Sequence, residues 1–203
     1  VNKNIFILSK QEVIGGMLCG FFLFSGYAFQ NFGLMNTTAS KSAFITSISV
    51  IIVPFILVLF KIQSINLRTW MTVIIATIGL YLLLVPGKNE LKIGDILTFG
   101  CAFSFAIHII GQDLYIKKNI QLLPFFLIQA SFVTLCSFIS AHIFESQSII
   151  WSQRLIAAIL ITGIFATFIA ILLILTLYLS LRKKSYDFKI LFFILVFSLQ
   201  QIY

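Results

Sequence analysis

The hydrophobic positions of this chain are gathered into long runs that short polar segments separate. A helix crosses the hydrocarbon core of a bilayer with about 20 mostly apolar residues, and the longest runs approach that length. They are apolar all round instead of alternating in polarity, so they predict helices and not the strands of a membrane barrel. The expected spans are Val13–Phe29, Ala43–Phe60, Trp70–Val85, Ile96–Ile110, Leu122–Phe144 and Leu155–Leu181, with a weaker run, Ile190–Leu199, that is too short to cross unaided.

The composition agrees with an all-α, polytopic membrane helix bundle. Of the 203 residues, 60% are hydrophobic and 10% are charged, against roughly 45–50% and 25% in soluble globular proteins. A mean hydropathy of +1.09 leaves too few polar residues to cover a soluble surface, which excludes the soluble enzymes. The net charge of +8 does not indicate a nucleic-acid partner, because the 14 Lys and Arg residues are scattered between apolar runs.

The distribution of Lys and Arg predicts the orientation of the spans, because cytoplasmic loops carry the excess of these residues. We expect both ends of the chain to be cytoplasmic and the segment around Pro86 to lie outside, in the cell (cytoplasmic or inner) membrane. The cytoplasmic set is Lys3, Lys10, Lys61, Arg68, Lys117, Lys118, Arg182, Lys183, Lys184 and Lys189, and the outer set is Lys41, Lys88, Lys92 and Arg154.

No pattern for enzymatic chemistry is present in the sequence. The two histidines do not form an H-E-x-x-H pair, and neither a G-x-S-x-G elbow nor a glycine-rich phosphate loop occurs. The acidic residues lie at or outside the ends of the expected spans. Cys19, Cys101 and Cys136 lie inside apolar stretches, where a thiol packs as a small hydrophobe. We therefore predict no catalytic residue, metal site, disulfide or cofactor.

A polar segment between the first two runs contains three candidate solute contacts, Gln30, Asn31 and Lys41. In one interpretation these side chains line the mouth of a polar cavity that receives an anionic or zwitterionic solute. In the other, the segment is a solvated hairpin whose Thr and Ser residues cap the next helix while Lys41 extends to the membrane surface.

His108 is an ionisable residue inside the fourth run, where it is costly unless it faces protein or water. Gln112 follows it by four positions and shares its helical face, so this face either lines a pathway that passes a proton or bonds a neighbouring helix. Gln129 in the fifth run has the same two interpretations, as a solute contact or as a hydrogen bond between helices.

The first two runs also carry residues that shape helices. Gly15, Gly16, Gly20 and Gly26 lie in the first run, and their spacing predicts close approach of another helix. Pro54 lies inside the second run and is expected to kink or weaken that helix.

Several short motifs occur in a fixed order between Val13 and Ala170. They are Phe32-Gly33-Leu34, residues 37–47 leading into Val53-Pro54, residues 79–83, residues 94–98, and residues 101–103 followed by residues 106–110. In order, spacing and internal boundary this set resembles the EamA-type family of drug/metabolite transporters.

The resemblance implies a fold of ten helices in two inverted five-helix repeats around a central solute cavity. The six spans would be the third to eighth helices, so the chain would be a fragment that lacks the first two and the last two. Residues 1–87 would be the C-terminal part of the first repeat, with three transmembrane helices, and residues 88–181 the N-terminal part of the second, with three more. Residues 182–203 are a divergent basic and apolar tail, for which a shifted reading frame is one hypothesis.

The sequence as a whole predicts an integral membrane secondary transporter that moves a small polar metabolite or drug by alternating access. Its expected partners are membrane lipids and a small-molecule solute. The alternative is a truncated remnant that does not transport, because two complete repeats need about ten spans and at least ~250 residues. Pairing of two chains as a homodimer would supply the missing helices.

Overall fold

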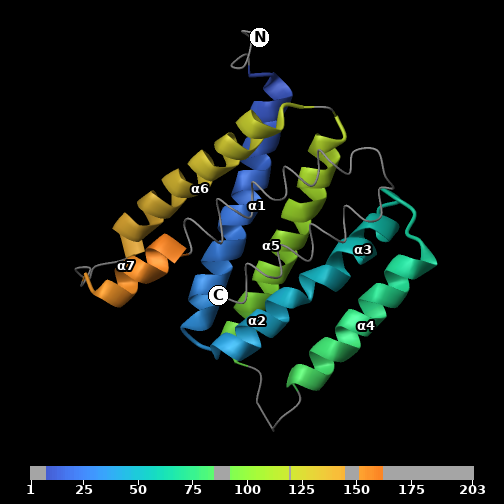
Figure 1. Cartoon of the computed structure of the whole chain (residues 1–203), viewed down its shortest axis with the longest axis horizontal. Helices are drawn as coiled ribbons and strands as arrows, with labels where there is room; N and C mark the ends of the chain where they lie inside the picture. Colours follow the sequence, from blue (N-terminus) through green and yellow to red (C-terminus); the bar gives the residue numbers. More distant parts are fainter. Residues whose placement is uncertain (1–7, 85–91, 119, 145–150, 162–203) are drawn as a thin grey trace. The chain divides into compact units, whose positions relative to one another are not determined.

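The computed structural model describes residues 8–84, 92–118, 120–144 and 151–161, and these residues are mostly helical, with no strand among them (Figure 1). This confirms the predicted all-α class. The chain divides into two compact units, residues 1–139 and residues 140–203. The helices are α1 (Lys10–Leu34), α2 (Ala39–Ser47), α3 (Ser49–Leu59), α4 (Leu67–Leu84), α5 (Ile93–Ile116), α6 (Leu122–Phe144) and α7 (Gln153–Leu160).

Four helical segments in the described part of the chain are long and apolar enough to cross a membrane. They are Lys10–Leu34, Ala39–Leu59, Ile93–Ile116 and Leu122–Phe144. The described part of the third expected span lies in α4, which ends at Leu84, the last described residue before Val85. For the sixth, only α7 and the residues next to it are described, and the run Ile190–Leu199 lies outside the described residues.

Helix α1 is longer than its apolar run because polar residues start it. The Ser9 side chain accepts the backbone N–H of Glu12 at 3.2 Å, and the Glu12 carboxylate accepts the backbone N–H of Ser9 at 2.8 Å. This capping box begins the helix at Lys10, ahead of the predicted start at Val13. Glu12 also accepts the backbone N–H of Gln121 at 2.8 Å, so it joins the starts of α1 and α6.

The second expected span is two helices, α2 and α3, and not one. The interruption lies at Ile48, whose N–H bonds the carbonyl of Ile45 at 3.1 Å, one residue short of the α-helical partner. The Ser47 hydroxyl donates to the carbonyl of Ala43 at 2.7 Å, a bond that bends helices. Pro54, which the sequence marks as the weak point, lies inside α3. The interruption of the helical bonding therefore comes before the proline.

Helix α5 is the centre of the first unit and runs antiparallel to α1, as Figure 1 shows. In the most apolar stretch of each helix, 61% of the residues are buried in α5 and 33% in α1. Helices α2 and α3 also pack on α5. Its core residues include Cys101, Ala102, Phe105 and Ala106, each with no exposed surface. A residue on α5 is therefore placed where three other helical segments meet it.

The glycines of α1 allow the close approach of its neighbours, as their spacing predicts. A Cβ at Gly15 would lie 2.5 Å from the Tyr115 ring of α5, and one at Gly16 would lie 2.7 Å from Ile128 of α6. Near the other end of α1, a Cβ at Gly33 would meet the Thr98 hydroxyl at 2.5 Å. Side chains in these places would force the helices apart.

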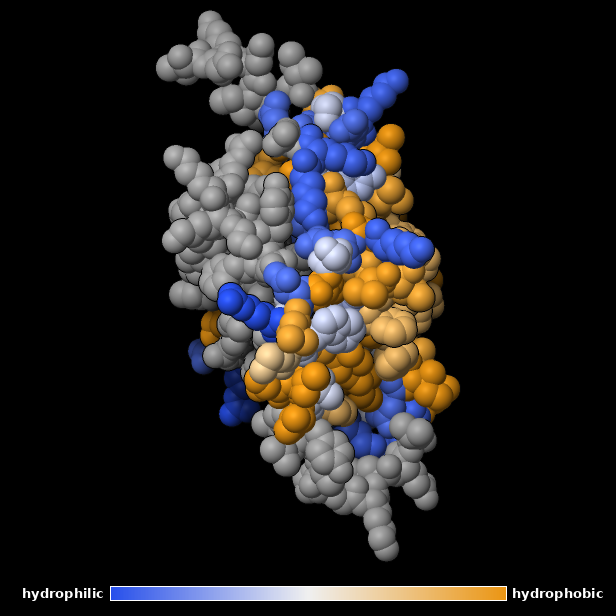
Figure 2. Space-filling view, turned by 90° about the vertical axis from the view of Figure 1, so that its right-hand side faces the viewer, coloured by the Kyte–Doolittle hydropathy of each residue, from blue (hydrophilic) through white to orange (hydrophobic). Residues whose placement is uncertain are grey.

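Large apolar side chains are exposed on most described helices, among them Phe21 on α1, Phe55 on α3, Ile75 on α4 and Phe103 on α5. Figure 2 shows broad apolar areas on one face, with hydrophilic residues between them and near the ends. A soluble protein rarely exposes so much contiguous apolar surface. Lipid tails are the environment in which this surface is stable.

Candidate functional site

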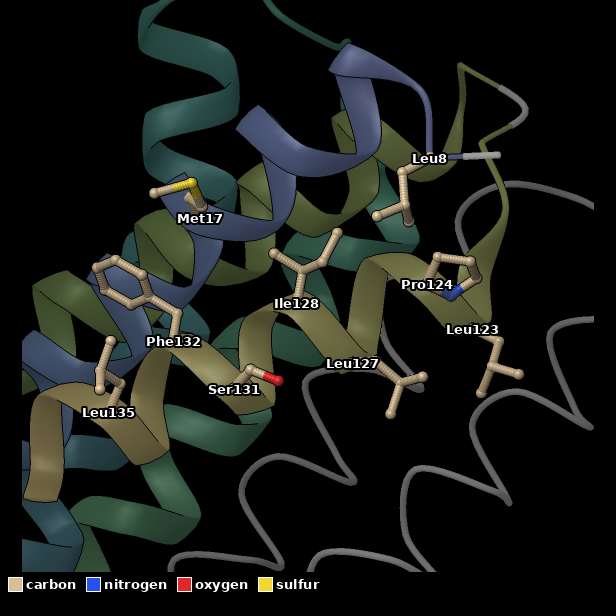
Figure 3. A pocket seen from close by; sticks show the side chains of 9 residues that line it. All are labelled: Leu8, Met17, Leu123, Pro124, Leu127, Ile128, Ser131, Phe132 and Leu135. Carbon is tan, nitrogen blue, oxygen red and sulfur yellow. The ribbon is translucent and has the colours of Figure 1, made fainter. Parts of the chain in front are cut away.

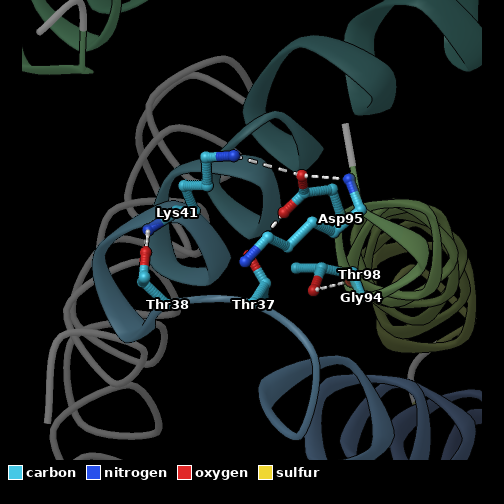
Figure 4. Close-up of polar contacts among 7 residues, drawn as sticks. Thr37, Thr38, Lys41, Gly94, Asp95 and Thr98 are labelled. Carbon is cyan, nitrogen blue, oxygen red and sulfur yellow. Dashed lines mark hydrogen bonds and ion pairs between the residues drawn. The ribbon is translucent and has the colours of Figure 1, made fainter. Parts of the chain in front are cut away.

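A buried carboxylate, Asp95, joins the start of α5 to the α1–α2 turn (Figure 4). It is 4% exposed and accepts the backbone N–H of Lys92 at 3.0 Å. The Thr37 hydroxyl donates to the other carboxylate oxygen, Oδ1. The Lys41 ammonium lies 3.3 Å from Oδ2, the oxygen that accepts the Lys92 N–H. We call Thr37, Lys41 and Asp95 the latch cluster. It ties the turn and the first residues of α2 to α5.

Below the latch cluster, small polar side chains line the contact between α2 and α5. The Thr46 hydroxyl of α2 lies 3.8 Å from the Cys101 sulfur of α5. Ser42 precedes Thr46 by one turn and Thr98 precedes Cys101 by about one turn, so helical spacing puts them on the same faces. All four are at most 1% exposed. We call Ser42, Thr46, Thr98 and Cys101 the α2–α5 seam.

The seam contains a polar atom with no hydrogen-bond partner, the Ser42 hydroxyl oxygen. Thr98 satisfies its hydroxyl by donating to the carbonyl of Gly94 at 2.8 Å, within its own helix. An unpartnered buried hydroxyl costs free energy unless water or a ligand reaches it. A water or solute that reached the seam would find a hydrogen-bonding group in the Ser42 hydroxyl.

A second polar group lies farther along α5, where α1 and α6 pack on it. The His108 ring is 3% exposed, and its Nδ1 lies 2.9 Å from the carbonyl oxygen of Cys19. One turn later, the Gln112 amide donates to the Gln129 side-chain oxygen of α6 at 3.1 Å. The Nε2 of Gln129 has no partner, although its residue is 2% exposed.

A groove of about 390 Å³ lies between the start of α1 and α6 (Figure 3). Ser131 is the polar residue of its lining, so the groove suits a hydrocarbon chain better than a polar solute. Its other lining residues are Leu8, Met17, Leu123, Pro124, Leu127, Ile128, Phe132 and Leu135. In the described part of the chain no three His, Cys, Asp or Glu residues gather as a metal site requires.

Comparison with known proteins agrees with these observations. Residues 2–85 match the model of the EamA-like transporter family. Over these residues the chain is similar to that family. A protein of Archaeoglobus fulgidus, named an uncharacterized transporter, is 34% identical over 156 residues, which are 76% of this chain and 49% of that protein. The chain thus spans about half the length of its curated relative. No solved structure matches it.

The structure brings three of the five predicted solute contacts to one end of the bundle. Lys41 pairs with Asp95 there, and Gln30 and Asn31 lie in the last turns of α1, half-buried and exposed respectively. The other two, His108 and Gln129, lie at the α1–α5–α6 contact. The 13 positions from Asp95 to His108 correspond to about 20 Å along a helix. The five residues therefore do not form one cluster in this conformation.

Asp95 is the important residue that the sequence reasoning missed, because it stands at the end of an apolar run, where a charge usually marks the membrane boundary. A usable signal was present. Asp95 is the third residue of its helix, where a carboxylate caps the backbone, and Gly94 before it allows another chain segment to come close. Glu12 occupies the same place in α1 and is likewise buried.

The Gln112–Gln129 hydrogen bond predicts a non-additive response to mutation. Gln112→Leu or Gln129→Leu alone leaves one buried amide unpaired, which costs about 1 kcal/mol between membrane helices. The double variant loses both amides together, so its loss of stability is expected to be smaller than the sum of the single losses. Thermal unfolding in detergent measures this, and strictly additive shifts would show that the two amides do not interact.

Proposed function

We propose that this chain acts as a secondary transporter, or as part of one, and moves a small polar metabolite or drug by alternating access in the cell (inner) membrane. The observation that carries the proposal is the α2–α5 seam, a set of buried hydroxyl and thiol groups inside membrane-length helices. Polar groups inside a membrane bundle are costly unless they face its interior or a water-filled cavity. The family match and the name of the relative agree with transport and not with enzymatic chemistry.

The charge pattern supports a neutral or zwitterionic solute. In the described helices, each Lys, Arg, Asp and Glu lies in or next to a first or last turn. The polar groups between the ends are uncharged hydroxyls, amides and the His108 imidazole. A net charge crossing this interior would meet no compensating charge. Gln30, Asn31 and Lys41 at one end, and His108 and Gln129 deeper, stay the proposed contacts, with His108 as the proton-linked group.

The number of helices in the complex decides whether they can enclose a solute path. The chain spans about half of its curated relative, and we propose that two copies pair so that their helices surround a path. Two inverted repeats, with a boundary near residues 87–88, stay the proposed architecture. The molecular mass of the detergent-solubilised complex, measured by light scattering, distinguishes one copy from two.

Reconstitution tests the proposed function. Proteoliposomes that contain the chain are loaded with a defined mixture of amino acids and uncharged and zwitterionic metabolites, and mass spectrometry follows what remains inside. We expect at least one solute to leave faster than from protein-free liposomes. If every solute in a sufficiently broad mixture is retained equally, the alternative holds, a membrane protein that does not transport.

A further inference from the structure

The contact between α2 and α5 has the construction of a closed gate. Its outer boundary is the latch cluster, where α2 is tied to α5 by charged and hydrogen-bonded groups. The Asp95 side chain is 3% exposed and that of Lys41 is 24% exposed, so solvent reaches one partner of the pair. A tie of this kind is strong while it is intact, yet it can dissociate into water from the exposed side.

The seam behind the latch cluster can separate at low cost. Separating a large apolar contact exposes hydrocarbon to water, at about 25 cal/mol for each Å². The α2–α5 seam presents Ser42, Thr46, Thr98 and Cys101 in place of such side chains. By contrast, the α1–α5 contact contains the buried Phe105 ring. Water that enters the seam would also give the Ser42 hydroxyl the partner that it lacks.

The backbone provides a place for α2 to pivot. The α-helical bonding is interrupted at Ile48, between α2 and α3. Pro54 lacks a backbone N–H, so the carbonyl of Val50 loses its usual helical donor in the next turn. Helices bend where such bonds are missing. The nine residues of α2 can therefore move against α5 while α3 stays packed on it.

We propose that Thr37, Lys41 and Asp95 form a gate that, on release, lets α2 pivot at Ile48 and opens the α2–α5 seam to a neutral or zwitterionic solute. This inference rests on the transport function proposed above and locates the solute path at the α2–α5 seam. Its test measures exposure of the seam and not transport. Failure of one is thus distinguishable from failure of the other.

Cys101 is a native reporter of the seam, because it is fully buried beside Thr46. The full chain with Cys136→Ser is treated in detergent with a hydrophilic charged maleimide, and mass spectrometry reads Cys19 and Cys101 separately. Loss of one charged hydrogen bond changes the equilibrium between closed and open states by about tenfold or more. Lys41→Met and Asp95→Asn are therefore each expected to raise the reaction rate of Cys101 by about that factor. Lys41→Arg keeps the charge and should hold the rate near that of the parent.

Two controls separate a gate from general loosening. Cys19 is 2% exposed and lies at the α1–α5 contact, so its rate should stay unchanged in both latch variants. Asp113→Asn breaks the exposed pair with Lys117 near the other end of α5 and should leave Cys101 protected. Unchanged Cys101 reactivity in Lys41→Met overturns the proposal, as does an equal rise at Cys19. If Asp95→Asn does not fold, Lys41→Met decides, since it keeps the bond between Asp95 and the Lys92 backbone.

Discussion

Gly94→Ala is expected to lower the apparent melting temperature of the purified protein by roughly 10 °C, because overpacking a tight contact costs about 3 kcal/mol. A Cβ at Gly94 would lie 2.5 Å from the carbonyl oxygen of Gly33 and 2.7 Å from the carbonyl carbon of Asn36. These are backbone atoms, which cannot turn away as a flexible side chain can. The end of α1 and the start of α5 would have to separate, and the latch cluster beside them would be strained.

Gly100→Ala is the matched control on the same helix. The nearest atoms to its Cβ would be those of the Phe29 ring, at 3.4 Å and beyond, which is an ordinary contact. Alanine is also the better helix former, by roughly 1 kcal/mol. This variant should melt at the temperature of the parent or slightly above it. Equal melting temperatures for the two alanine variants would show that the close α1–α5 approach at Gly94 is wrong.

The sequence predicted the helices well because their length and apolar character are set by the membrane and not by distant contacts. Leu122–Phe144 was predicted with the bounds that α6 has. The starts of α1 and α5 were placed too late, because the first turn of each helix contains charged residues, among them Glu12 and Asp95. Proline is a visible marker of helix breaks, whereas the bond pattern at Ile48 depends on local geometry that no single residue type specifies.

The candidate site was harder to predict from the sequence, because a polar residue in an apolar run gives the same sequence pattern whether it faces a solute or a neighbouring helix. The shared face of His108 and Gln112 followed from helical spacing, and both are buried on α5. Their partners, the Cys19 carbonyl and the Gln129 amide, depend on how α1 and α6 pack. The latch cluster joins residues about 55 positions apart, and no local pattern shows that pairing.

Covalent modification of Cys101 is expected to block solute movement completely. A maleimide adduct beside Thr46 would fill the space between α2 and α5 and prevent the seam from closing or admitting a solute. The reaction is slow in the parent protein, because Cys101 has no exposed surface in this conformation. Proteoliposomes of the Cys19→Ser, Cys136→Ser protein can therefore be sampled as the modified fraction rises.

If solute crosses along the α2–α5 seam, as we propose, efflux must depend on the fraction of Cys101 that is modified. Efflux of the transported solute is expected to fall in proportion to that fraction and to approach the protein-free rate when modification is complete. In a protein that also carries Cys101→Ser, the reagent should not change whatever efflux the untreated sample has. Undiminished efflux from fully modified Cys101 protein would contradict the claim and move the path elsewhere in the bundle.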